Sequence, residues 1–390
     1  MNLHESPEET AFRAEVRAWM AAHLHGEFEP LRFSNGLGDP SYDPTLAKRW
    51  ERELARGGWI GLGWPAEAGG RAMPLGRQLI FHEEYVRCGG PGRIGHIGEQ
   101  LLAPTLIDHG TPEQRARFLP GILGGTEYWA QGYSEPGAGS DLANVRTRAR
   151  RDAASGDWVI DGQKVWTSWA HESDWIFVLA RTEEGSQRHH CLTLLLAPLR
   201  QSGITIRPIR QMTGGAEFNE VFFEGARTEA ALHLGPVGQG WKVAMALLGY
   251  ERGVSTLGQQ AHFRHELGLV VEAARANGAA RDPLLRQRLA QAGIGLATLR
   301  FHALRVLGDA AGAASLAAYT SKYAWSNWRR DLGRLAMDVL GADADVVREG
   351  DVRAERLRLL WLAGRSDTIY AGTNEIQLNL IAERGLGMPR

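Results

Sequence analysis

The spacing of apolar residues changes twice along the chain, and this change constrains the fold more than any other feature. From Phe12 to Leu24 apolar residues recur at helical spacing. Short apolar runs of strand length then follow one another through the middle third, and from about Gly240 the helical spacing returns and lasts to the end. We therefore predict an α+β protein with an N-terminal helical domain (1–125), a middle antiparallel β-barrel or sandwich (126–235) and a C-terminal four-helix bundle (236–390).

Local signals support this order. Serine or threonine, then proline and glutamate or glutamine, mark a helix start at Ser6 and another at Thr111. Two long amphipathic stretches, 284–307 and 314–340, are typical of a helical bundle. Two apolar runs around Asp161-Gly162 predict a β-hairpin. Further strands are predicted at 175–180, 191–196, 204–206 and 218–223.

Composition excludes several classes of protein. Among 390 residues, 44 Lys and Arg nearly balance 45 Asp and Glu, so nothing favours binding to nucleic acid or to a membrane surface. The polar N-terminus has no signal-peptide core, and we expect no membrane span. The two cysteines, Cys88 and Cys191, fit a reducing cytoplasm rather than a disulfide framework. We expect no metal, because neighbouring residues on a strand, such as His189, His190 and Cys191, point to opposite faces.

Two glycine-containing segments differ in what they predict. Residues 90–95 match the GxGxxG dinucleotide pattern, but no buried strand precedes them, so we interpret them as a connector. Residues 129–142 read WAQGYSEPGAGSDL, in which small residues after a proline allow a ligand to approach the backbone, and exposed amides and the hydroxyls of Ser134 and Ser140 can donate hydrogen bonds. By residue chemistry alone, a polar loop between a helix and the β-domain remains the alternative.

Three segments together resemble the acyl-CoA dehydrogenase family. Residues 129–142 resemble its signature, Lys164-Val165-Trp166-Thr167-Ser168 its second flavin segment, and the stretch TIYAGTNEIQ at 368–377 its flavin-proximal loop. They occur in family order, and the helix–β–helix plan covers nearly the whole chain. The resemblance implies an FAD-dependent oxidation of an acyl-CoA thioester to a trans-2-enoyl-CoA.

The resemblance also implies roles for individual residues. Those expected at FAD are Gln131, Tyr133, Ser134, Gly139, Ser140, Trp166, Ser168, Arg275, Thr373 and Glu375. Those expected at the substrate are Ser140, Tyr250, Arg252, Tyr370 and Gly372. Three positions depart from the family pattern: Glu375 stands where many members have Gln, residues 338–342 read DVLGA instead of a Gln-x-x-Gly-Gly segment, and the Phe-Gly expected after Arg275 is missing.

The catalytic base is the largest departure. Many family members carry a glutamate after the tyrosine of the flavin-proximal loop, and here that position is Ala371, whose methyl group cannot accept a proton. Subgroups of the family place the base on the helix that follows the β-domain, in a Glu-Arg context that Glu251-Arg252 matches closely. We therefore predict Glu251 as the base, with an ordinary exposed helical ion pair as the alternative interpretation.

Partners and alternatives follow from the same resemblance. We expect an electron-transfer flavoprotein or similar acceptor, and assembly into a homodimer or homotetramer, with a heteromer as a further option. One alternative is a non-catalytic subunit that pairs with a catalytic homologue, which Ala371 favours. Another is a flavin oxidase or monooxygenase on the same fold.

Overall fold

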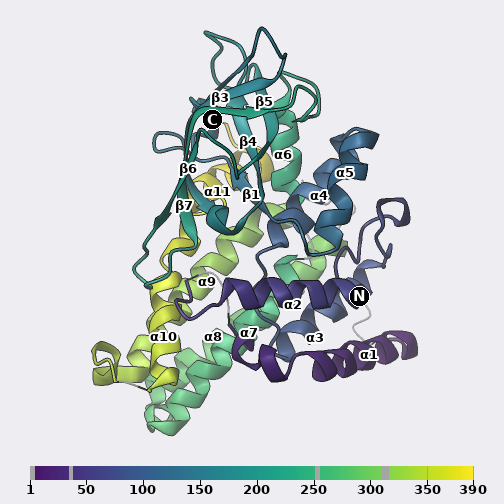
Figure 1. Cartoon of the computed structure of the whole chain (residues 1–390). Helices are drawn as coiled ribbons and strands as arrows, with labels where there is room; N and C mark the ends of the chain where they lie inside the picture. The colour runs from purple at the N-terminus through teal and green to yellow at the C-terminus, as the bar shows by residue number, and fades with distance from the viewer. Residues whose placement is uncertain (1–4, 35–37, 251–254, 309–315, 349, 390) are drawn as a thin grey trace. The chain divides into compact units, whose positions relative to one another are not determined.

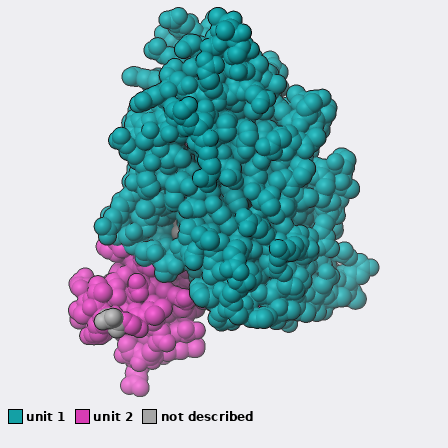
Figure 2. Space-filling view, viewed as in Figure 1, with its two compact units in different colours: residues 1–78, 89–251 teal, residues 79–88, 252–390 magenta. Residues whose placement is uncertain are grey.

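The computed structural model describes residues 5–34, 38–250, 255–308, 316–348 and 350–389, with the backbone alone at 255–258 and 307. Its contacts divide the chain into two compact units (Figure 2). Unit 1 comprises residues 1–78 and 89–251, and unit 2 comprises residues 79–88 and 252–390. The boundaries of the three domains expected from the sequence remain a prediction.

Two helices of unit 1 begin where the sequence predicts, directly after Ser6 and directly after Thr111. Both capping boxes are present: the Ser6 hydroxyl accepts from the Glu9 amide and the Glu9 carboxylate accepts from the Ser6 amide, and Thr111 and Gln114 do the same. The helices are α1 (Pro7–His23), α2 (Pro44–Arg56), α4 (Ala103–His109), α5 (Pro112–Leu123) and α6 (Gly240–Tyr250), with a π-helical turn at Ile97–Leu102 and α3 (Leu75–Arg87) divided between the units.

The middle of the chain forms an eight-stranded sheet in the order β6-β7-β3-β2-β4-β5-β8, with β1 paired to β4 (Figure 1). Its strands are β1 (Trp129–Gly132), β2 (Arg148–Arg151), β3 (Trp158–Ser168), β4 (Trp175–Arg181), β5 (Leu192–Pro198), β6 (Ile204–Ile209), β7 (Phe218–Thr228) and β8 (His233–Leu234). Most pairs are antiparallel, as predicted, whereas β4 pairs in parallel with both β1 and β2. The α+β fold class is therefore confirmed.

The predicted hairpin at Asp161-Gly162 is wrong. Residues 158–168 form one continuous strand, paired along its length with β7. The register shifts at Asp161, and Gly162 has φ +147° with the backbone of Thr147 close to the position of its absent side chain. The glycine thus serves a bulge and a close backbone approach rather than a turn.

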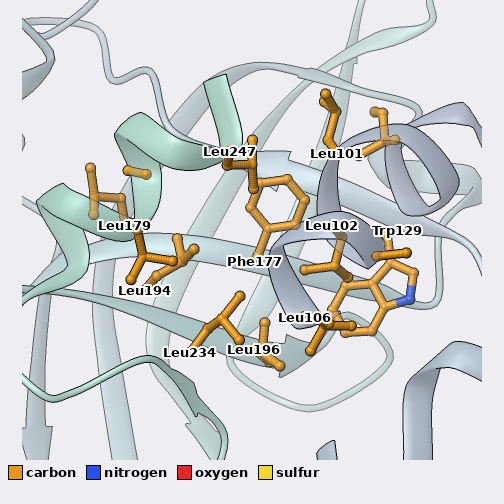
Figure 3. Packing of buried hydrophobic residues seen from close by; sticks show 14 of the residues in the cluster. Leu101, Leu102, Leu106, Trp129, Phe177, Leu179, Leu194, Leu196, Leu234 and Leu247 are labelled. Carbon is orange, nitrogen blue, oxygen red and sulfur yellow. The ribbon is translucent and has the colours of Figure 1, made fainter. Parts of the chain in front are cut away.

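One face of the sheet is buried against helices of unit 1 (Figure 3). Phe177, Leu179, Leu194 and Leu196 project from β4 and β5 toward leucines of the π-helical turn, α4 and α6. These side chains are excluded from water, and such burial contributes roughly 1.5–3 kcal/mol per large apolar side chain. Trp129 of β1 and Tyr133 belong to the same core, which therefore also holds the first segment that resembles the flavin site.

Unit 2 contains the helical bundle. The two long helices predicted from amphipathic spacing are confirmed where the structure describes them. The α-helices that it describes in the C-terminal part of unit 2 are α7 (Ser255–Ala276), α8 (Pro283–Gly308), α9 (Leu316–Leu340), α10 (Val352–Ala363) and α11 (Asn374–Leu380). Val270, Leu332, Leu335 and Leu357 belong to the buried cluster that joins α7, α9 and α10. Across the described part of both units, no helix is long and apolar enough to cross a membrane.

Candidate active-site segments

The loop after β1 carries the first predicted flavin segment. Gln131 lies half-buried in β1, and Tyr133 is buried with its ring 5.7 Å from that of Phe177 in an edge-on contact. Glu135 and Ala138 then exchange two backbone hydrogen bonds, of 3.1 and 3.0 Å, which close a tight turn. Nothing lies within 4 Å of where a side chain would project at Gly139. The outer side of the turn is therefore open to a ligand.

A buried ion pair holds this loop to β3. The Lys164 ammonium is fully excluded from water and donates to the Glu135 carboxylate (2.8 Å), the Tyr133 carbonyl (3.0 Å) and the Leu179 carbonyl (2.8 Å). The Glu135 carboxylate also accepts from the backbone amides of Arg146 (2.6 Å) and Thr147 (2.9 Å). All three protons of the ammonium thus have an acceptor, which is the condition for burying this charge.

The ion pair changes the pKa of both partners. Burial lowers the pKa of Lys164 to about 8, although the Glu135 charge opposes this change. Burial alone would raise the pKa of Glu135, but the attraction of Lys164 and the hydrogen bonds outweigh it and lower the pKa. Glu135 is therefore a structural carboxylate that stays ionised rather than a candidate base.

Trp166 stands on a strained part of β3. Its φ is +60°, in the left-handed region that side-chain-bearing residues avoid, and the pairing with β7 shifts register between Lys164 and Thr167. The indole is 58% exposed and touches Phe218 edge-on at 6.2 Å. Ser168 follows, half-buried and paired with Phe218. An exposed aromatic face on strained backbone suits stacking against a planar ligand.

The remaining predicted residues of unit 1 lie in different settings. Ser134 is half-buried, and its carbonyl accepts from the Val165 amide at 2.9 Å. Ser140 is exposed at the end of the loop. The Tyr250 hydroxyl donates to the Asp108 carboxylate, and burial followed by this hydrogen bond raises the pKa of the phenol. The predicted base Glu251 and the substrate residue Arg252 lie outside the described residues.

The third predicted segment forms a loop between α10 and α11 in unit 2. Tyr370 is 45% exposed, and its hydroxyl donates to Asp367 at 2.9 Å. Ala371 has φ +52° and Gly372 has φ +89°, so two successive residues take left-handed backbone. Thr373 then caps α11 by accepting from the Ile376 amide. The loop is a tight reversal that ends at a helix N-terminus.

The predicted FAD residues on the helices of unit 2 are exposed. Glu375 lies in the first turn of α11, and Arg275 lies in the last turn of α7. Asp338, which begins the altered 338–342 segment, pairs with Arg288 of α8 at 2.6 Å. Its carboxylate is therefore engaged within unit 2.

A buried charge cluster beneath the loop was missed by the sequence analysis. Arg329 of α9 contacts Glu266 of α7 through two short hydrogen bonds (2.7 and 2.9 Å) and reaches Asp367 of the loop at 2.9 Å. These partners are 63 and 38 residues away in sequence. No local motif connects them, so only the fold reveals the cluster.

Comparison with known proteins agrees with the fold. The models of the acyl-CoA dehydrogenase N-terminal, middle and C-terminal domains match residues 6–126, 130–226 and 238–386. The chain is 53% identical to acyl-CoA dehydrogenase IpdE1 of Mycobacterium tuberculosis over 97% of each chain.

Solved structures give the same result. One named Tcur3481-Tcur3483 steroid ACAD superposes with a TM-score of 0.86 at 30% identity over 100% of each chain. The ChsE4-ChsE5 complex from Mycobacterium tuberculosis gives a TM-score of 0.85 at 28% identity, again over 100% of each chain. The chain therefore belongs to the acyl-CoA dehydrogenase family, which typically binds FAD, and is an oxidoreductase that acts on acyl-CoA thioesters.

Proposed function

We propose that this acyl-CoA dehydrogenase uses bound FAD and Glu251 to form a trans-2-enoyl-CoA from a ring-bearing acyl-CoA. The observation that carries the cofactor is Trp166, a largely exposed indole held on left-handed backbone beside the second flavin segment. FAD, when bound, supplies the acceptor for the hydride that leaves the substrate Cβ.

The described residues fit a flavin on two counts. The indole of Trp166 offers a flat apolar face, and the open turn around Gly139 leaves backbone amides accessible to the polar edge of a ring. We propose Thr373 as a further contact of FAD, as the family resemblance implies. Tyr133, whose ring is buried in the core, would contribute through its backbone.

The base must be a carboxylate near the substrate Cα, and two buried carboxylates beside the predicted segments are already engaged. Glu135 is bound to Lys164, and Asp367 is bound to Arg329 and Tyr370. Ala371 offers only a methyl group. Glu251 is our proposed base for these reasons and because its Glu-Arg context matches the subgroups with a base after the β-domain. Hydrogen bonds to the thioester carbonyl would stabilise the enolate charge that develops as the proton leaves.

Two observations favour a ring-bearing acyl group. Ala371 replaces a longer side chain at the position where many relatives carry glutamate, which leaves room next to Tyr370. A similar solved structure is named a steroid ACAD. We propose, as further parts of this function, a cytoplasmic location, an electron-transfer flavoprotein as the electron acceptor, and an oligomeric assembly.

An anaerobic titration tests the proposal. The purified protein is mixed with butyryl-CoA, octanoyl-CoA, palmitoyl-CoA, isovaleryl-CoA, cyclohexanecarboxyl-CoA or cholyl-CoA while the visible flavin absorption is followed. Bleaching by the ring-bearing thioesters, with little effect of the straight chains, is expected. Bleaching by straight short chains alone would contradict the substrate class, and a yellow protein that no thioester bleaches would contradict the reaction.

A second candidate is a non-catalytic subunit of a heteromeric dehydrogenase. Ala371 and the altered segment at Asp338 favour it, and the names of two similar structures each join two different chains. Flavin content per chain distinguishes the candidates. Stoichiometric FAD in the chain purified alone supports a catalytic role, whereas a colourless chain that gains flavin only after co-expression with a second homologue supports the subunit role.

A further inference from the structure

Asp367 is held at three atoms by three side chains of unit 2. Arg329 donates to carboxylate oxygen Oδ2 at 2.9 Å, the Tyr370 hydroxyl donates to Oδ1 at 2.9 Å, and the Lys322 ammonium donates to the backbone carbonyl. The Asp367 side chain is only 1% exposed. Both oxygens of a buried carboxylate and the carbonyl of the same residue are thus fixed.

The groups that hold Asp367 are themselves fixed. Arg329 forms a bidentate pair with Glu266, whose side chain is 6% exposed, through nitrogens other than the one that donates to Asp367. Lys322 is buried, and its ammonium stands 4.7 Å from the ring centre of Trp325 and 5.2 Å from that of Tyr370. Contacts within α9 and with α7 therefore hold the two cations that contact the loop in fixed positions.

Short-range hydrogen bonds within the loop and a ring contact of Tyr370 with Trp325, at 6.3 Å between ring centres, add to these contacts. The Ile369 and Tyr370 amides donate to the Ser366 carbonyl at 2.8 and 3.1 Å, and these short-range bonds close a single turn. The next residue, Ala371, is in left-handed backbone, which a residue with a Cβ does not favour. The side-chain amide of Gln377 donates to the Ala371 carbonyl over a long distance of 3.4 Å. An unfavourable backbone conformation persists when its surroundings hold it on both sides.

We propose that Asp367, held by Arg329, Lys322 and Tyr370, is a positioning residue of this dehydrogenase. It fixes the 366–372 loop so that the Tyr370 ring and the Ala371 backbone keep the conformation used with acyl-CoA. This inference rests on the proposed placement of Tyr370 and Gly372 at the substrate. Asp367 itself touches neither substrate nor cofactor in this account and acts through the loop.

The test compares two variants that each remove one carboxylate from Arg329. Asp367→Asn removes the charge on the loop side, and Glu266→Gln removes the charge on the α7 side without touching the loop. Hydrogen–deuterium exchange of a peptide covering residues 366–373 reports the Ile369 and Tyr370 amides directly and requires no substrate. We expect at least 10-fold faster exchange in Asp367→Asn and less than 3-fold change in Glu266→Gln. Equal acceleration in both variants, or none in Asp367→Asn, would overturn the proposal.

One further variant tests the hydroxyl of Tyr370, and another serves as the control for misfolding. Tyr370→Phe removes only the hydroxyl bond to Asp367 and is expected to accelerate loop exchange about 3-fold. Arg334→Met, on the exposed side of α9 where Arg334 pairs with Asp331, is the matched control and should change nothing.

For the reaction, flavin bleaching per bound flavin is measured with cyclohexanecarboxyl-CoA. Asp367→Asn should raise KM or slow bleaching at least 10-fold, with a rate in Glu266→Gln within 3-fold of the wild type. Unchanged bleaching in a variant with a mobile loop would overturn the positioning role. If the wild type is not bleached, the proposed function fails, whereas the exchange measurement still decides whether Asp367 fixes the loop.

Discussion

The two units hold a residue with left-handed backbone in place by different means. Each contains a non-glycine residue in left-handed backbone, Trp166 in unit 1 and Ala371 in unit 2, and each places a buried ion pair close to it in sequence. Around Trp166 the strand ladder resumes at once, since Thr167 pairs with Asn219, and the side-chain amide of Asn219 also donates to the Thr167 carbonyl at 2.9 Å. The loop of Ala371 has no ladder and depends on side-chain charges.

This difference shows which interactions hold the backbone in each region. In the sheet, backbone hydrogen bonds to a neighbouring strand hold the strained residue, and Lys164 mainly attaches the preceding loop. In the helical unit, Arg329 is shared by two carboxylates from separate segments. Removing one cation should therefore have unequal consequences in the two units.

The largest effect is expected from Arg329→Met. The substitution leaves two buried carboxylates, Glu266 and Asp367, without their cation, and breaking one buried pair already costs about 3–5 kcal/mol. Lys164→Met leaves one buried carboxylate, Glu135, which keeps its two amide donors, and two carbonyls without the ammonium, so its cost should be smaller. Scanning calorimetry of the two variants measures the order. A greater loss of stability in Lys164→Met than in Arg329→Met would break the comparison.

A compensating substitution sharpens the comparison in unit 1. Glu135→Gln, added to Lys164→Met, removes the uncompensated charge, and its single amide oxygen can still accept from one of the Arg146 and Thr147 amides. The double variant should recover at least about 1 kcal/mol relative to Lys164→Met alone. Urea unfolding measures the difference, and a double variant no more stable than the single one would show that the charge was not the source of the loss.

Acid should weaken unit 2 through Glu266. Burial raises the pKa of this carboxyl, but the attraction of Arg329, together with the contact of His262, outweighs burial and lowers the pKa well below its ordinary value of 4.5. The unfolded chain therefore takes up the proton first as the pH falls. The stabilisation is complete above about pH 4.5 and is progressively lost below it. Unfolding measured between pH 6 and pH 3 should show a shallower decline in Glu266→Gln, and parallel declines would contradict this contribution.

The smallest effect is expected at Ala371. Glycine adopts left-handed backbone without a Cβ penalty, so Ala371→Gly should change stability by no more than about 1 kcal/mol, in the stabilising direction if strain outweighs the entropy gained on unfolding. Ala371→Val, with a branched Cβ, should destabilise the loop instead. Thermal unfolding of the pair measures the sign. A valine variant as stable as the glycine variant would show that the loop does not hold φ near +52°.

The elements of the fold followed from local sequence, and the charge clusters did not. The capping residues Ser6 and Thr111 and the helical spacing of α8 and α9 depend on residues three or four positions apart, which the sequence displays. The hairpin predicted at Asp161-Gly162 is wrong because glycine occurs in bulges as well as in turns. Thr147, which leaves no room for a side chain at position 162, lies on another segment of the chain. Such a contact between distant segments cannot be predicted from one sequence without an alignment.

The candidate site divides in the same way. The exposed Trp166, the open turn at Gly139 and the capping Thr373 lie within the segments that the sequence identified. Lys164 lies within one of these segments, but its role in holding the loop depends on the Tyr133 and Leu179 carbonyls. Arg329 belongs to no motif, and its partners come from two other segments of the chain.

The most direct test of the central claim is anaerobic mixing of Glu251→Gln with the acyl-CoA that bleaches the wild-type flavin. A positioned base contributes roughly 10²–10⁴-fold. The account predicts that the variant keeps stoichiometric FAD and stays yellow, with bleaching slowed by at least about 100-fold. Bleaching at close to the wild-type rate would contradict it and would show that another group removes the α-proton.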